Sequence, residues 1–303
     1  MRIDLLGVRG STPCPGRDFE KVGGHTSSVA ISANDSAPSL LLDAGTGLRS
    51  LDRLLHGEPF RGALLLGHLH WDHTQGLPFC SSIDRDDAQV RLLLPRQGHE
   101  PGALLARAMS PPHFPVTPHQ LRGTWSFEDM EPGWHDIEQF RVLAREVPHK
   151  GGRTFGFRVE DGVSAFAYIS DHAPQLLGPG PDGWGAYHRS ALELCEDVDL
   201  LIHDAQYLTS ELPTLGAFGH ASADYGAGLG AVAGARRVLL FHHDPGRTDD
   251  EVEAICRDVA ARHETVELGV AREGMSIDLG QAGPPEGSPR GCHPPLQSTG
   301  FRP

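Results

Sequence analysis

Short apolar runs recur along the chain, and most of them end at a glycine or a polar residue. The run Ala-Leu-Leu-Leu at 63–66, for example, lies between Gly62 and Gly67. An apolar run of this length between turn residues is typical of a buried strand. Similar patterns predict strands at 3–8, 29–32, 39–42, 90–94, 140–147, 155–159, 165–169, 200–202 and 237–241.

Helical patterns fill the gaps between these strands. In segment 250–262, the apolar residues at 252, 255, 256, 259 and 260 fall on one face of a helix. This spacing predicts a helix that packs against a core. Further helices are predicted at 48–55, 102–109, 186–196 and 221–234. The chain is therefore long enough, and regular enough, for one large α/β domain or two smaller ones.

The composition is typical of a soluble globular protein, with 39% hydrophobic and 22% charged residues in a chain of 303. From residue 281 onward the sequence changes to glycine, proline, serine and polar residues. Segments of this kind cannot bury enough apolar surface to fold. We therefore expect a folded domain over residues 1–280 and a disordered tail over residues 281–303.

The chain is acidic, with 26 Lys and Arg against 40 Asp and Glu and a net charge of −14. This charge disfavours a long nucleic acid as a partner, because such binding depends on basic contacts to phosphates. A small anionic substrate remains compatible with it, since bound metal ions can supply local positive charge.

The cysteines and the N-terminus indicate the cytoplasm. None of the five cysteines belongs to a CxxC pair, so we expect reduced packing residues. The chain opens directly into a strand pattern without the profile of a signal peptide. No apolar segment approaches the length of a membrane span, so no membrane partner is expected.

The densest group of polar chemistry follows the predicted strand at 63–66. Residues 68–76 read His-Leu-His-Trp-Asp-His-Thr-Gln-Gly. If the backbone stays extended, His68 and His70 share one face, because side chains alternate with period two. Asp72 and His73, in the following turn, can then point to a second position nearby. One short segment could thus hold two metal ions.

Five strand-like runs end in His or Asp, and convergence at one edge of a sheet explains this most simply. One metal ion would take His68, His70 and His149. The other would take Asp72, His73 and a late histidine, with Asp171 bridging the two ions. This set of imidazoles and carboxylates suits two divalent ions, zinc above all, with manganese or iron as alternatives. Asp43 has two interpretations, either to orient a metal ligand or to cap the next helix.

This order of residues resembles the metallo-β-lactamase superfamily. The resemblance implies a four-layer αββα sandwich with a dinuclear metal site at one edge of its two sheets. Asp171 and the Leu-Phe-His pattern at 240–242 are similar to the phosphodiesterase branch, which includes ribonuclease Z. The family places its late ligand directly after the strand, which favours His242 and leaves His243 as the alternative.

Two further elements resemble that branch. His-Asp-Ala at 203–205 is similar to its His-Glu-Ala element, and Gly-His-Ala-Ser at 219–222 to its Gly-His-Ser element. The resemblance implies that Asp204 and His220 pair beside the metal ions, with His220 giving a proton to the leaving oxygen. Alternatively, His220 merely precedes a helix. His172 and His203 are expected to support the metal ligands or to be structural, and not to bind metal themselves. His25 stands where relatives usually have asparagine, which leaves its role open.

The pattern Val-Arg-Gly-Ser-Thr-Pro at 8–13, with Gly23 and Gly24, resembles the smaller relatives in this branch that hydrolyse phosphodiesters, including cyclic nucleotides. This resemblance implies a phosphodiesterase that hydrolyses a small, cyclic-nucleotide-like phosphodiester through a hydroxide activated by two metal ions. Asp72 is expected to be essential to that reaction as well as to metal binding. The loop at 111–116, which contains His113, is expected to help form the substrate pocket. By resemblance, a homodimer is also expected.

Three alternatives are open. The same metal ions would activate water against a lactone, a thioester or a sulfate ester, because the fold does not fix the substrate. A non-enzymatic metal sensor is disfavoured by the complete ligand set. Transfer-RNA 3′-end cleavage is disfavoured as well, since ribonuclease Z carries a long insertion that grips transfer RNA between its third histidine motif and the aspartate. Only 21 residues, 150–170, occupy that interval here.

Overall fold

The computed structural model describes residues 1–33 and 36–280, and the tail predicted at 281–303 lies outside the described residues. Within the described ranges, two seven-stranded sheets pack face to face. The first sheet has the order β14 (Ser276–Asp278), β1 (Arg2–Gly7), β2 (Ser28–Ser32), β3 (Leu40–Leu42), β4 (Arg61–Leu65), β5 (Gln89–Pro95) and β6 (Thr124–Met130). The second has the order β13 (Glu267–Val270), β12 (Arg237–Phe241), β11 (Leu200–Asp204), β10 (Ala165–Ile169), β9 (Thr154–Glu160), β8 (Phe140–Val147) and β7 (Gly133–Ile137).

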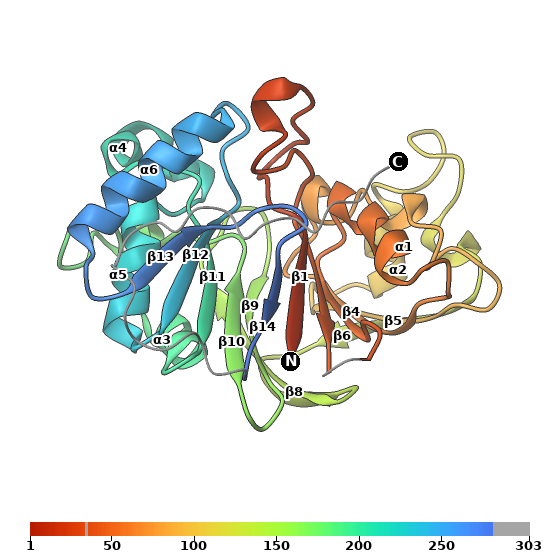
Figure 1. Ribbon diagram of the computed structural model, residues 1–303. Coiled ribbons are helices and arrows are strands. Elements are labelled where there is room, and N and C mark those ends of the chain that lie inside the picture. The colour runs from red at the N-terminus through yellow and green to blue at the C-terminus, as the bar shows by residue number, and fades with distance from the viewer. Residues whose placement is uncertain (34–35, 281–303) are drawn as a thin grey trace.

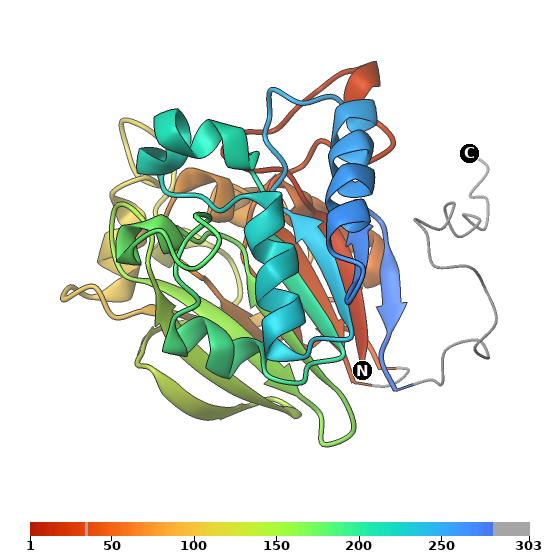
Figure 2. The ribbon, with the colours of Figure 1, turned by 90° about the vertical axis from the view of Figure 1, so that its left-hand side faces the viewer.

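Helices cover the outer faces of both sheets. In Figure 1, α1 and α2 lie on the right, outside the first sheet, and α3, α5 and α6 lie on the left, outside the second. Figure 2 shows this second helical layer from the front. The predicted αββα sandwich is therefore confirmed. The α-helices are α1 (Leu51–Leu54), α2 (Pro101–Ala106), α3 (Arg189–Cys195), α4 (Leu212–Leu215), α5 (Ala223–Ala233) and α6 (Asp249–Arg262).

The alternation of side chains in the strands explains this layering. In β3, Leu40 and Leu42 belong to the central core between the sheets, whereas Leu41 belongs to the cluster under α1 and α2. The neighbouring strand β4 repeats this pattern, with Leu64 facing the outer cluster. Both faces of these strands are buried, so the strands read as continuous apolar runs.

The strand directions bring several carboxyl ends to one edge. In the second sheet, β10, β11 and β12 are parallel neighbours. Strand β8 runs in the same direction, since β9 is antiparallel to both β8 and β10. In the first sheet, β3 and β4 are also parallel. Residues that follow these strands are thereby gathered on rigid supports.

Several predicted boundaries differ from the structure. The helix expected at 48–55 divides into a 3-10 segment, η2 (Thr46–Ser50), and the short α1. Helix α2 ends at Ala106 and α3 begins at Arg189, so both are shorter than predicted. Strands β6, β7, β13 and β14 were not predicted, because they lie at or next to sheet edges and expose many polar side chains.

A buried ion pair ties the loop after β1 to the start of α6. The Arg9 side chain is fully buried, and its guanidinium lies 2.5 Å from a carboxylate oxygen of Asp249. Arg9 also donates to the backbone oxygens of Gly23 and Arg247, each at 2.8 Å. Removing one partner of a buried pair leaves the other charge without compensation. This pair therefore holds the loop that reaches the site described below.

We expect Arg9→Leu to lower the free energy of unfolding by about 3–5 kcal/mol, because Asp249 would stay buried without its partner. Urea denaturation measures this change. The matched control is Arg236→Leu, whose side chain is 77% exposed in its pair with Asp199. An exposed pair contributes about 1 kcal/mol or less. Equal losses in the two variants would contradict the role assigned to Arg9.

Candidate metal centre

The predicted metal ligands come together at the edge where β4, β8, β10 and β12 end. In one group, the ligand atoms of His68, His70, His149 and Asp171 lie within 4.8 Å of one another. In a second group, the same limit holds for Asp72, His73 and His242. The two groups are those that the sequence predicted for the two metal ions.

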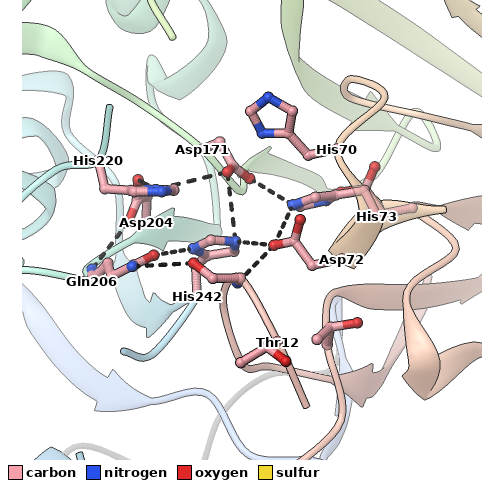
Figure 3. A network of polar contacts seen from close by, with 12 residues as sticks. Thr12, His70, Asp72, His73, Asp171, Asp204, Gln206, His220 and His242 are labelled. Atoms are coloured by element: carbon pink, nitrogen blue, oxygen red, sulfur yellow. Dashed lines mark hydrogen bonds and ion pairs between the residues drawn. The ribbon is translucent and has the colours of Figure 1, made fainter. Parts of the chain in front are cut away.

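The carboxylate of Asp171 lies between these groups, as Figure 3 shows. One of its oxygens is 3.7 Å from His68 Nε2 and 3.6 Å from His149 Nε2. That oxygen, Oδ1, is also 3.5 Å from His242 Nε2. The other oxygen, Oδ2, is 3.0 Å from His73 Nε2. Asp171 thus has the central position that a bridging carboxylate requires.

The ring orientations direct the Nε2 atoms of two histidines into the cluster. His149 donates from Nδ1 to the backbone oxygen of Gly219 at 2.6 Å. His242 donates from Nδ1 to Gln206 Oε1 at 2.9 Å. When such a ring is neutral, as metal binding requires, its other nitrogen, Nε2, is an acceptor. Both Nε2 atoms face Asp171, and metal-binding histidines are typically fixed in this way by an outer partner.

Several buried atoms in the cluster lack a hydrogen-bond partner among the described residues. They include both ring nitrogens of His68. They also include Nε2 of His73 and Oδ2 of Asp171, which lie 3.0 Å apart as an ion pair without the geometry of a hydrogen bond. A buried polar atom without a partner costs about 1–3 kcal/mol. Burial also lowers the pKa of His68 well below its usual value, which keeps that ring neutral. Neutral imidazoles and unsatisfied carboxylate oxygens fit divalent metal ions.

The carboxylates make the centre attractive to cations. Burial opposes a charge on His73, but Asp171, Asp72 and Asp43 outweigh it and raise the pKa of His73 well above its usual value. Burial likewise opposes ionisation of Asp72, yet His73 and His242 hold the pKa of that carboxyl well below its usual range. A metal ion would compete with protons for the same favourable positions.

Asp43 supports His73 from behind, in the role that the sequence left open. One of its oxygens accepts from His73 Nδ1 and from the Tyr168 hydroxyl, both at 2.8 Å. The other accepts from the backbone N–H of Gly67, also at 2.8 Å. The capping alternative is wrong, because Gly45 precedes η2 as its N-terminal cap.

The structure separates His242 from His243. His243 Nε2 donates to the backbone oxygen of Ala271 at 2.9 Å, away from the cluster. His242 has a φ of 56°, which turns its ring toward Asp72 and Asp171. Gly10 packs directly on this ring, and a Cβ at that position would lie 2.4 Å from His242 Nδ1. Glycine is therefore required at position 10, because any side chain there would collide with the His242 ring.

Two residues of the site were missed from the sequence. Gln206 orients His242, as described above, and the backbone N–H of Ser11 donates to Asp72 Oδ2 at 2.7 Å. The Ser11 contact is a backbone contact and carries no residue-specific signal. Gln206 follows the His-Asp-Ala element by one position, which was the available signal.

Asp204 and His220 form the pair that the resemblance implied. Asp204 is fully buried, and its Oδ2 accepts from His220 Nδ1 at 3.1 Å. The same oxygen accepts from the backbone N–H groups of His172 and Ala221 at 3.0 and 3.1 Å. His220 stacks on His242 with ring centroids 4.9 Å apart. The alternative that His220 only precedes a helix does not account for these contacts.

The remaining histidines lie outside the two ligand groups. His172 and His203 are buried and contact each other at 3.0 Å through Nδ1 and Nε2. His25 contacts Thr46 Oγ1 at 3.2 Å. His113 lines a cavity beside the centre without joining either group.

A protein-family model described as "Beta-lactamase superfamily domain" matches residues 39–243, more than half of the chain. That range contains the whole ligand cluster. The chain belongs to the metallo-β-lactamase superfamily. Together, the family and the cluster indicate a metal-dependent hydrolase. No helix in the described residues has the length and apolar character needed to cross a membrane.

Known proteins resemble the chain over most of its length. Ribonuclease Z from Salinibacter ruber is 27% identical, over 84% of this chain and 90% of that protein. The metallo-β-lactamase fold protein YhfI from Bacillus subtilis has a TM-score of 0.68 at 17% identity, over 91% and 99% of the two chains. A diphosphatase from the PhnP family has a TM-score of 0.66 at 15% identity, over 92% and 97%. These two structures show the fold alone.

We expect Asp43→Asn to weaken metal binding about 10–100-fold, because the carboxylate that fixes His73 would be lost. Competition with a chelating dye measures the affinity. The control is Asp136→Asn, on the exposed part of β7. Unchanged metal affinity in a folded Asp43→Asn variant would contradict the supporting role of Asp43.

Proposed function

We propose that the protein is a phosphodiesterase that hydrolyses a small, cyclic-nucleotide-like phosphodiester with two divalent metal ions, zinc by preference. The observation that carries this proposal is the position of Asp171 between two ligand groups, with the Asp204–His220 pair beside it. A pair of ions is suited to a phosphoryl group, whose attacking and leaving oxygens both need stabilisation. The names ribonuclease Z and diphosphatase, carried by two similar proteins, both refer to phosphate linkages.

Metal ions bound by the two groups would lower the pKa of water and offset the charge of the phosphoryl group. Asp72 Oδ2 accepts a hydrogen bond from the backbone N–H of Ser11 and lies 3.2 Å from His242 Nε2. Because Asp72 also lies 3.3 Å from His73 Nε2, it connects the two histidines of the second ligand group. Movement of Asp72 would disturb both His73 and His242.

His220 is suited to proton transfer. Its Nδ1 is engaged by Asp204, so Nε2 is the nitrogen left for the substrate. Asp204 orients the ring, and the backbone donors on Asp204 keep the carboxylate in place. A positioned imidazolium of this kind can donate a proton to the leaving oxygen.

A small substrate fits the structure better than a long nucleic acid. Between His149 and Asp171 the chain forms only the strands β9 and β10 and their short connections. No arm extends from this interval. The acidic net charge of −14 disfavours many phosphate contacts.

Transfer-RNA 3′-end cleavage is the second candidate. The similarity to ribonuclease Z from Salinibacter ruber over 84% of this chain favours it. The two candidates share the metal centre and differ in how the substrate is held. Direct comparison of substrates separates them.

The test is a panel of bis(p-nitrophenyl) phosphate, 3′,5′- and 2′,3′-cyclic nucleotides and a precursor transfer RNA, with metal content measured on the same preparation. We expect one nucleotide substrate to be hydrolysed faster than the generic ester, with activity lost on chelation and restored by zinc. Selective cleavage of the precursor would establish the second candidate. Metal-loaded protein inert toward every phosphodiester would overturn the proposal and direct the search to lactones, thioesters and sulfate esters.

We expect His220→Ala to lower kcat about 10²–10⁴-fold with wild-type metal content, because general acid catalysis is worth about that factor. Asp72→Ala should abolish hydrolysis while the protein stays folded by circular dichroism. His135→Ala, on the edge strand β7, is the control for loss of an imidazole. His220 also lies within reach of Asp171 and His242, so loss of metal from His220→Ala would show that it is a ligand instead.

A further inference from the structure

A cavity of about 880 Å³ opens beside the first ligand group. Its wall begins at His68 and His70 and continues through the loop after β4. The opposite wall comes from α2, labelled in Figure 1, and from the loop that follows it. The volume lies in the upper part of the range of ligand pockets, about 300–1,000 Å³. A ligand at the metal centre would therefore extend into this space.

Aromatic side chains project into the cavity. Trp71 lies between the ligands His70 and Asp72 in sequence, yet 73% of its surface is exposed. Phe79 is 57% exposed, and its ring meets Phe114 edge-on with centroids 5.8 Å apart. Large apolar side chains left exposed in a concave site indicate a ligand that covers them. Flat aromatic groups bind such surfaces by stacking.

The cavity also offers one uncommitted positive charge. Two arginines line it, Arg107 and Arg153. Arg153 is paired with Glu131 and Glu146, at 3.4 and 3.0 Å. Arg107 is exposed and has no ion pair or hydrogen bond from its side chain among the described residues. In a chain of net charge −14, an arginine left unpaired beside a candidate phosphoryl site is suited to a second anionic group.

We propose that this cavity binds the part of the substrate beyond the scissile ester: a nucleobase against Trp71 and Phe79, and a second phosphate at Arg107. This inference rests on the proposed function and adds a preference within it: among nucleotide phosphodiesters, the site favours those that carry a second phosphate. Stacking on aromatic rings tolerates every base. The cavity therefore selects for the presence of a base and of a second phosphate, and not for the identity of the base.

The test measures binding to the zinc-loaded full chain by isothermal titration calorimetry, so it does not depend on turnover. The probes are ribose 5-phosphate, AMP and ADP, which add first a base and then a second phosphate. We expect AMP to bind about tenfold more tightly than ribose 5-phosphate, because one stacked base contributes about that factor. ADP should bind more tightly than AMP.

Three variants assign these gains to side chains. Trp71→Ala and Phe79→Ala should each reduce the advantage of AMP over ribose 5-phosphate, and Arg107→Ala the advantage of ADP over AMP. Phe79→Ala keeps the test valid if Trp71→Ala disturbs the neighbouring ligands, and metal content is measured on every variant. Trp134→Ala is the control for loss of an exposed tryptophan, since Trp134 lies on β7 outside the cavity.

Equal binding of all three probes, or gains that survive the substitutions, would overturn the inference. The expected binding pattern in a protein that hydrolyses no phosphodiester would support the cavity assignment and reject the proposed function. Hydrolysis of phosphodiesters with no contribution from the cavity side chains would support the proposed function and reject the cavity assignment. The two proposals can therefore fail separately.

Discussion

The structure depends on one buried carboxylate, Asp171, which lies where the edges of the two sheets meet. Imidazoles that follow β4, β8 and β12 all approach it. So many buried polar groups in one place are costly unless a cation satisfies them. The folded cluster is therefore stabilised when metal ions bind. The apolar packing of both sheets keeps its polar groups from separating.

Rigid support makes this centre possible. The ligands stand at or just after the ends of strands whose side chains fill the core on both faces. A second set of residues then fixes the ring orientations: Asp43 behind His73, Gln206 behind His242, and the backbone of Gly219 behind His149. Such outer contacts determine which lone pair faces the metal ions. The buried Arg9–Asp249 pair extends this support to the loop that carries Ser11.

In the proposed function, metal chemistry and substrate selection belong to different parts of the molecule. The ligand cluster and the Asp204–His220 pair provide chemistry that serves many esters, since a fold does not determine a substrate. We propose that selection belongs to α2 and the loops around it, which form the cavity wall. Loops of this kind vary without disturbing the strands beneath them, so related proteins can keep one centre and act on different substrates.

Local patterns in the sequence were enough to predict the buried strands, α6 and most of the two ligand groups, whereas the preference for His242 came from the family resemblance. The density of histidines at 68–73 and the His or Asp residues that end the apolar runs both follow from periodicity and residue chemistry, which are local properties. Edge strands such as β6 and β7 escaped prediction, because half-exposed strands have no strong apolar pattern. The tail at 281–303 stays a prediction.

Only the tertiary structure decided between neighbours and between roles. His242 and His243 are adjacent and chemically identical, and the backbone turn at φ 56° directs one to the cluster and the other to Ala271. Asp43 reads equally well as a cap or a support until His73 is placed beside it, 30 residues away in sequence. The contacts of Ser11 and Gln206, and the cavity beside Trp71, likewise join distant segments. Sequence patterns report what each segment can form, whereas contacts between segments depend on how the sheets pack.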